Sequence, residues 1–204
     1  MNSLIPLTKE KIQVSRTPSE LKTWISNVRS ALDLNKSELK KARKKQGLYK
    51  EFIDEITPLS EFCKERFTDS YHVKPIIGSD NYDAEISHVN GLEKHFIELT
   101  MPHDGEREAN ESKLAKQRGY GTPKLFAPGE EVAEQFIFAI ETARKKSSKD
   151  YSKCILVFAL PISYRFAEVQ DQQIFAEDKI ISEISTMKFK DGLNNSPQTM
   201  ANGY

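Results

Sequence analysis

Three carboxylates, Asp83, Glu85 and Glu98, lie within the short stretch 81–100 at a spacing that could hold a metal ion. The stretch is typical of two strands joined at Asn90-Gly91, because this pair favours a two-residue type I′ turn with positive φ at both positions. Side chains alternate along a strand, so the three acids then share one face. Like charges opposite each other destabilise a sheet, and a divalent cation would remove that repulsion. The alternative is an ordinary amphipathic hairpin whose polar face lies in water.

The expected turn also fixes the pairing of the two strands. Val89 faces Leu92, and Asp83 comes to lie directly opposite Glu98. The other face is apolar and predicted to be core; it comprises Tyr82, Ala84, Ile86, Ile97, Leu99 and Met101.

A helix predicted over residues 48–67 could add a further carboxylate. Its apolar side runs through Phe52, Ile56 and Cys63, with Pro58 starting a new turn or bending the helix. Glu55 lies closer to that side than Glu61 does, so Glu55 is the candidate acid. A surface position is the plainer interpretation for both residues.

Other elements follow from apolar periodicity and from helix-start signals. Residues 1–18 suggest a loose leader, and Thr17-Pro18-Ser19-Glu20 starts a helix. A long helix is predicted over 130–146. The continuous apolar run 153–160 indicates a strand buried on both faces and ended by Pro161. Further helices are predicted over 106–118 and 171–186, and residues 191–204 read as a disordered tail.

Composition gives weaker constraints. The 204 residues include 30 basic and 30 acidic side chains, so attraction to nucleic acid must come from a local patch. The densest basic run is Lys40–Lys45, which could contact phosphates but is also typical of a solvated helix face. No apolar run is long enough for a membrane span, and Cys63 and Cys154 read as buried thiols. We therefore expect a cytoplasmic protein.

The order of these elements resembles the PD-(D/E)XK nuclease superfamily, which has the restriction-endonuclease-like fold. The resemblance is carried by Asn81–Ile86 and Phe96–Thr100, supported by residues 131–160. It implies an α/β fold with a mixed central sheet flanked by helices. The expected parts are an N-terminal helical extension over 1–45, a nuclease-like core over 46–190 and a disordered tail over 191–204.

The resemblance also implies roles for individual residues. Asp83 and Glu98 would bind Mg²⁺ or Mn²⁺, and Leu99 would add a backbone carbonyl. Thr100 stands where the superfamily has its catalytic lysine, so the motif reads ExT instead of ExK. In some members a neighbouring helix supplies the lysine. Lys146 is the first candidate for that role here, with Gln135 as a polar companion and with Lys145 and Lys149 less well placed.

Three functions are therefore open. The first is a metal-dependent phosphodiesterase or nuclease that acts on nucleic acid, with DNA ranked ahead of RNA. It implies no membrane partner, and a homodimer is compatible with it. The second is an inactive member of the fold that binds nucleic acid or protein. The third is a small α/β protein whose polar hairpin face is surface. His103 and Asp104, just past the second strand, are candidate ligands, although Pro-His-Asp-Gly is first of all a turn sequence.

Overall fold

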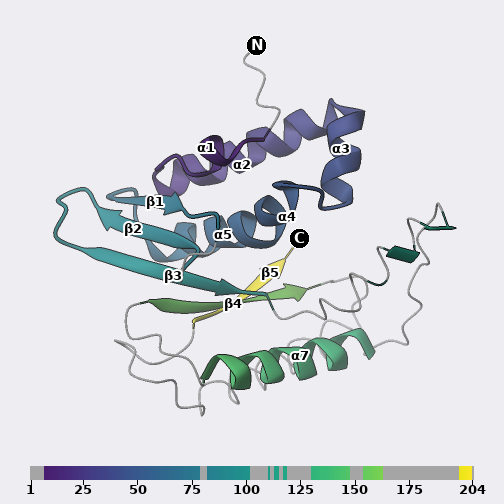
Figure 1. Ribbon diagram of the computed structural model, residues 1–204. Helices are drawn as coiled ribbons and strands as arrows, with labels where there is room; N and C mark the ends of the chain where they lie inside the picture. Colours follow the sequence, from purple (N-terminus) through teal and green to yellow (C-terminus); the bar gives the residue numbers. More distant parts are fainter. Residues whose placement is uncertain are drawn as a thin grey trace. The chain divides into compact units, whose positions relative to one another are not determined.

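The computed structural model describes residues 7–78, 82–101, 110, 113–114, 117–118, 130–147, 154–162 and 198–203 (Figure 1). The chain divides into two compact units. The first comprises Met1–Thr100 with Lys153–Val157, and the second comprises Met101–Ser152 with Phe158–Tyr204. The first unit holds helices α1 to α5 and strands β1 to β3.

The N-terminal segment is packed against the first unit, so the loose leader that we expected is wrong for its described residues. Helix α1 (Lys9–Ile12) buries Ile12 completely. Arg16 then forms an isolated bridge to Val73 of strand β1 (Tyr71–Pro75), with backbone hydrogen bonds of 3.0 and 2.7 Å in the two directions. Its guanidinium donates to the Lys11, Ile12 and Val14 carbonyls and lies 4.2 Å from the centre of the Trp24 ring. The pattern of apolar residues predicts neither backbone hydrogen bonds nor the burial of a cation, so these contacts could not be predicted from it.

Helix α2 (Pro18–Asp33) begins where the sequence predicted. The Thr17 side-chain oxygen accepts the Glu20 N–H, and the Thr17 N–H donates to the Glu20 carboxylate, which completes a capping box. The predicted apolar stripe is buried; its members are Leu21, Ile25, Val28 and Leu32. This helix, assigned above to an N-terminal extension, packs on α5 and on β1 inside the first unit.

Helix α3 (Lys36–Arg43) carries the basic run and has a defined end. Beyond it, Lys45 adopts a left-handed φ of 46°, the Gln46 N–H donates to the Lys41 carbonyl, and the Lys45 N–H donates to the Ala42 carbonyl. This is a Schellman motif in which lysine occupies the position usually taken by glycine.

The predicted helix over residues 48–67 is present but contains a wider turn. It consists of α4 (Tyr49–Glu51), the π-helical turn η1 (Phe52–Ile56) and α5 (Thr57–Arg66). Pro58 has no N–H to donate to the preceding turn, and its ring crowds the carbonyl four residues earlier. A π turn just before the proline accommodates that defect, and such turns are frequent at functional sites.

Strands β2 (Ala84–His88) and β3 (Lys94–Thr100) form the predicted hairpin in the predicted register, with Ala84 paired to Ile97 and Ser87 to Lys94. The turn itself differs from the type I′ turn that we expected. Only Gly91 has positive φ, at 72°, and its N–H donates to the His88 carbonyl.

The reason for the different turn lies outside the hairpin. The Val89 N–H donates to the Ser70 carbonyl, so Val89 and Leu92 do not pair as expected and both side chains are exposed. A four-residue loop centred on Asn90-Gly91 keeps the same strand register as a two-residue turn, which is why the register prediction holds.

The core of the first unit lies on the face predicted from alternation. Val73, Ala84, Ile86 and Ile97 are completely buried, and Leu99 is nearly so. Strand β1 pairs antiparallel with β2, and β2 with β3. Buried residues of α2 and α5 complete the core; among them are Leu21, Leu59, Phe62 and Cys63.

Helix α7 (Glu130–Ser147) of the second unit matches the prediction for 130–146. Strand β4 (Ile155–Ile162) starts in the first unit and ends in the second, and Leu156 to Ala159 are all buried, as predicted for a strand covered on both faces. The strand continues through Pro161, so the predicted stop there is wrong; proline removes one N–H without excluding an extended backbone. Strand β5 (Gln198–Gly203) occupies part of the expected disordered tail, because polar composition does not reveal main-chain pairing.

The chain therefore belongs to the α/β class. Its five-stranded sheet has the order β1-β2-β3-β4-β5. Most of the helix predicted over 106–118, and all of that over 171–186, lie outside the described residues. None of the described helices is long and apolar enough to cross a membrane.

Candidate functional site

Asp83 is fixed at a bend just before β2. Its N–H donates to the Ile97 carbonyl at 2.7 Å, and its own carbonyl accepts from the Ile76 N–H at 2.8 Å. The carboxylate oxygen Oδ2 accepts the Leu99 N–H at 2.7 Å. Asp83 is thus tied by both backbone and side chain to the strands on either side of it.

This arrangement corrects the predicted pairing of Asp83 with Glu98. Regular pairing of β2 with β3 ends at Ala84 and Ile97. Asp83 instead reaches across to the main chain of β3 at Leu99, the residue after Glu98. Leu99, predicted to lend a carbonyl to a metal, is seen here binding Asp83 through its N–H.

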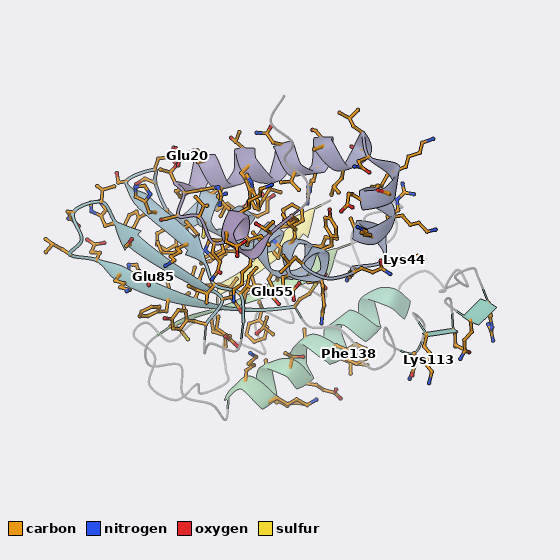
Figure 2. The ribbon with its side chains drawn as sticks, turned by 45° about the horizontal axis from the view of Figure 1, so that its top comes forward. Glu20, Lys44, Glu55, Glu85, Lys113 and Phe138 are labelled. Atoms are coloured by element: carbon orange, nitrogen blue, oxygen red, sulfur yellow. The ribbon has the colours of Figure 1, made fainter. Side chains whose placement is uncertain are left out.

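Glu55 lies on the π turn η1 and is half-buried (Figure 2). Burial first, and then the negative charges of Asp83 and Glu51, raise the pKa of its carboxyl to about 7. Because the charge of Asp83 contributes to this pKa, the two carboxylates are near enough to interact; their convergence on one site stays a prediction.

The sequence reasoning missed two other acids of the same helix. Asp54 is buried, and its Oδ1 pairs with the Lys45 ammonium at 2.9 Å. Glu51 has one carboxylate oxygen, Oε2, that is buried without a hydrogen-bond partner in the described part of the chain. Glu51, Asp54 and Glu55 are spaced i, i+3 and i+4, which places them together on one helix side. That spacing was the signal that could have found them.

The remaining hairpin acids are in different environments. Glu85 forms an ion pair of 3.0 Å with Lys94, so a cation of the chain offsets part of its charge. Glu98 is half-buried on β3 and, by alternation, points away from the face that carries Ile97 and Leu99. The polar face of the hairpin is thus neither fully solvated nor a single cluster of three acids.

Thr100, at the position of the superfamily lysine, is 7% exposed. Its hydroxyl oxygen is buried and makes no hydrogen bond with any residue that the structure describes. A buried polar group without a partner is unfavourable, so this position has a specific cost to stability.

Replacing Thr100 by valine is expected to raise the free energy of unfolding by about 1 kcal/mol, because it removes an unpaired buried hydroxyl at nearly constant shape. Thr57→Val is the matched control. Thr57 is also buried, but its hydroxyl donates to the Phe52 carbonyl at 2.9 Å, so that variant should lose about 1 kcal/mol. Urea unfolding of both variants measures the difference. Equal destabilisation of the two would show that the Thr100 hydroxyl has a partner.

The predicted helix residues belong to the second unit. Lys146 is half-buried and Lys145 exposed on α7, while the side chain of Gln135 lies outside what is described. Lys149, His103 and Asp104 also lie outside the described residues. Convergence of Lys146 with Asp83 stays a prediction.

The donor set around Asp83 suits a hard cation better than a soft one. Carboxylates of Asp83 and Glu55 supply oxygen, and Mg²⁺ commonly uses one or two protein carboxylates while keeping several waters. In the described part of the chain, no three His, Cys, Asp or Glu side chains come together closely enough to hold a metal by themselves. The residues thus fit a site with two carboxylates and water, not a cage of protein ligands.

Comparison of the chain with protein-family models, curated proteins and solved structures found no match.

Proposed function

We propose that the protein is a metal-dependent phosphodiesterase that acts on nucleic acid, as a nuclease with its site at Asp83. The observation that carries the proposal is the raised pKa of the half-buried Glu55, to which the charge of Asp83 contributes, with Glu55 placed by a π turn and Asp83 by an anchored hairpin bend. Such repulsion destabilises the fold unless a cation or a proton offsets it, and carboxylates with perturbed pKa values are frequent at functional sites.

The residues of the chain would divide the work as follows. Asp83, oriented by the Leu99 N–H, would hold Mg²⁺ or Mn²⁺ together with Glu55 or Glu98. A bound cation of this kind lowers the pKa of a coordinated water and neutralises charge that develops on the scissile phosphate. Glu55, with a pKa of about 7, can hold or release a proton near neutral pH. Lys146 is the candidate for the missing motif lysine.

The second candidate is a binding module of the same fold without catalysis. Two observations favour it. The motif position holds Thr100, which is buried and cannot supply the positive charge of a lysine. Among the described residues, no three metal-binding side chains are grouped together. For either function we propose DNA ahead of RNA as the ligand and the cytoplasm as the compartment. A homodimer is compatible with both functions.

Cleavage of end-labelled DNA and RNA, single- and double-stranded, with Mg²⁺ or Mn²⁺ against EDTA tests the proposal. Wild-type protein is expected to cleave only with metal. Asp83→Asn should lower the rate by at least about a hundredfold, since a metal ion supplies several kcal/mol of stabilisation to such a transition state.

Asp33→Asn is the matched control, because Asp33 is exposed at the end of α2. Activity that persists in Asp83→Asn, or that falls equally in Asp33→Asn, would overturn the assignment of the site. Absence of cleavage in every condition, with nucleic-acid binding retained, would favour the binding module.

A further inference from the structure

Four cationic side chains occupy one face of helix α3 and its C-terminal cap. Lys36, Lys40, Arg43 and Lys44 follow the spacing i, i+4, i+7 and i+8, which keeps them within roughly 100° of arc at about 100° per residue. All four are exposed. Their side chains make no hydrogen bond or ion pair with other described residues, and we call this set the α3 cationic face.

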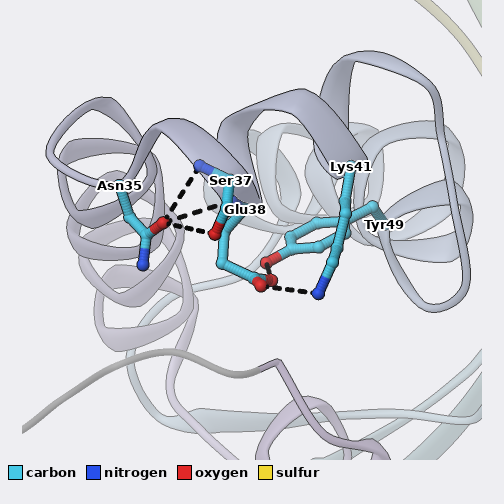
Figure 3. Close-up of polar contacts among 5 residues, drawn as sticks. All are labelled: Asn35, Ser37, Glu38, Lys41 and Tyr49. Carbon is cyan, nitrogen blue, oxygen red and sulfur yellow. Dashed lines mark hydrogen bonds and ion pairs between the residues drawn. The ribbon is translucent and has the colours of Figure 1, made fainter.

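The single acid of α3, Glu38, lies on the opposite side of the helix by its spacing, and Figure 3 shows it directed toward Tyr49 and Lys41. The Glu38 carboxylate accepts a hydrogen bond from the Tyr49 hydroxyl at 2.8 Å and pairs with Lys41 at 2.7 Å, and only 14% of its side chain is exposed. Lys45, next along the chain, is committed to Asp54. The internal acids are therefore neutralised by Lys41 and Lys45, and the charge of the α3 cationic face is left without compensation.

The face is also held rigidly. The Asn35 side-chain oxygen caps α3 by accepting the Ser37 and Glu38 N–H groups, each at 3.2 Å. The Schellman motif at Lys45 closes the other end, and Ala42 anchors the inner side. A fixed array of cations loses less conformational entropy on binding than a flexible basic tail would.

We infer that the α3 cationic face binds the phosphate backbone of a nucleic acid. From Lys36 to Lys44 the array extends about 12 Å along the chain at about 1.5 Å per residue. Duplex DNA presents one negative charge per roughly 1.7 Å of axis, so several phosphates fit against this length. The inference rests on the proposed function for its ligand class, and it names where the backbone of the substrate lies.

An anionic membrane is the competing partner, and the structure disfavours it. An interfacial helix needs a broad apolar face to enter the lipid. The inner side of α3 carries Ala42 and Glu38, both packed into the protein, and Leu34 is the large apolar side chain exposed beside the helix. Charge without an apolar face suits phosphates in water.

Fluorescence anisotropy of labelled duplex and single-stranded DNA in EDTA, over a range of salt concentrations, tests the inference without cleavage. The variant is Lys40→Gln/Arg43→Gln/Lys44→Gln. We expect at least about tenfold weaker duplex binding at low salt, with the slope of log K against log salt smaller by about 2–3, because each lost phosphate contact removes about 0.9.

The matched control is Lys9→Gln/Lys74→Gln/Lys113→Gln, which changes the net charge equally at exposed sites elsewhere (Lys44 and Lys113 are labelled in Figure 2). Equal losses in the two triple variants would reduce the effect to net charge and overturn the inference. Unchanged DNA binding by the α3 variant would also overturn it. The same holds if the wild-type protein binds phosphatidylserine vesicles through these residues and does not bind DNA.

The result separates from that of the cleavage assay. Binding that depends on α3, with no cleavage under any condition, would leave the inference standing and remove the nuclease. If the wild type cleaves, and the α3 variant binds and cleaves DNA equally well, the nuclease stands and the inference about the α3 cationic face is overturned.

Discussion

Replacing Lys45 by glycine is expected to lower the free energy of unfolding by about 2–3 kcal/mol, although glycine suits the backbone there. The left-handed φ of 46° costs a lysine about 1 kcal/mol, which glycine would recover. The same change leaves the buried Asp54 carboxylate without its partner. Breaking a buried pair typically costs about 3–5 kcal/mol, and the lower part of that range applies here because the Lys45 side chain is 39% exposed. The ion pair outweighs the backbone strain.

Urea unfolding of a double-mutant cycle measures the two contributions separately. Lys45→Asn keeps a residue that tolerates left-handed φ and removes the charge, so it should lose more than Lys45→Gly does. Lys45→Gly/Asp54→Asn should regain most of the loss, with a coupling energy of about 2 kcal/mol for residues in contact. A single Lys45→Gly variant that is more stable than wild type would show that the ion pair contributes nothing.

Stability should fall as the pH rises from about 4.5 through 7, because of Glu55. Its pKa is raised to about 7 in the folded protein, chiefly by burial and then by Asp83, so the folded state retains a proton that the unfolded chain releases near its ordinary pKa of 4.5. The stability that this retained proton contributes is fully present below pH 4.5 and is lost above pH 7. With a discount for solvent screening of a half-exposed group, the loss is about 1–2 kcal/mol.

Glu55→Gln removes this dependence, since glutamine stays neutral. In metal-free buffer the variant should match wild type near pH 4 and be about 1–2 kcal/mol more stable at pH 8. Glu65→Gln, at an exposed position of α5, should change neither value. A difference between Glu55→Gln and wild type that is the same at both pH values would contradict the raised pKa.

The parts of the fold set by periodicity were predictable from the sequence. The apolar stripe of α2, its Thr17 cap, the hairpin register and the buried run of β4 each depend on side chains close in sequence. The type of turn at Asn90-Gly91 was not predictable, because the Val89 N–H donates to the Ser70 carbonyl and this contact favours a different loop. Contacts of this kind depend on where distant segments meet.

The candidate site divides in the same way. Glu55 was selected from its place on the helical wheel; the charge of Asp83 contributes to its raised pKa, and its role in a site stays a prediction. The π turn follows from Pro58, but its length cannot be read from a proline alone. The pairing of Lys45 with Asp54 was hidden because it joins a helix cap to a helix interior.

The bridge between Arg16 and Val73 protects the fold against self-association. Strand β1 stands at one end of the sheet order, and an end strand with unpaired N–H and C=O groups is a template for pairing with another chain. Arg16 uses both backbone groups of Val73, at the middle of β1, and its guanidinium fixes the preceding residues in place. The N-terminal segment thus occupies the position where an aggregating strand would otherwise add.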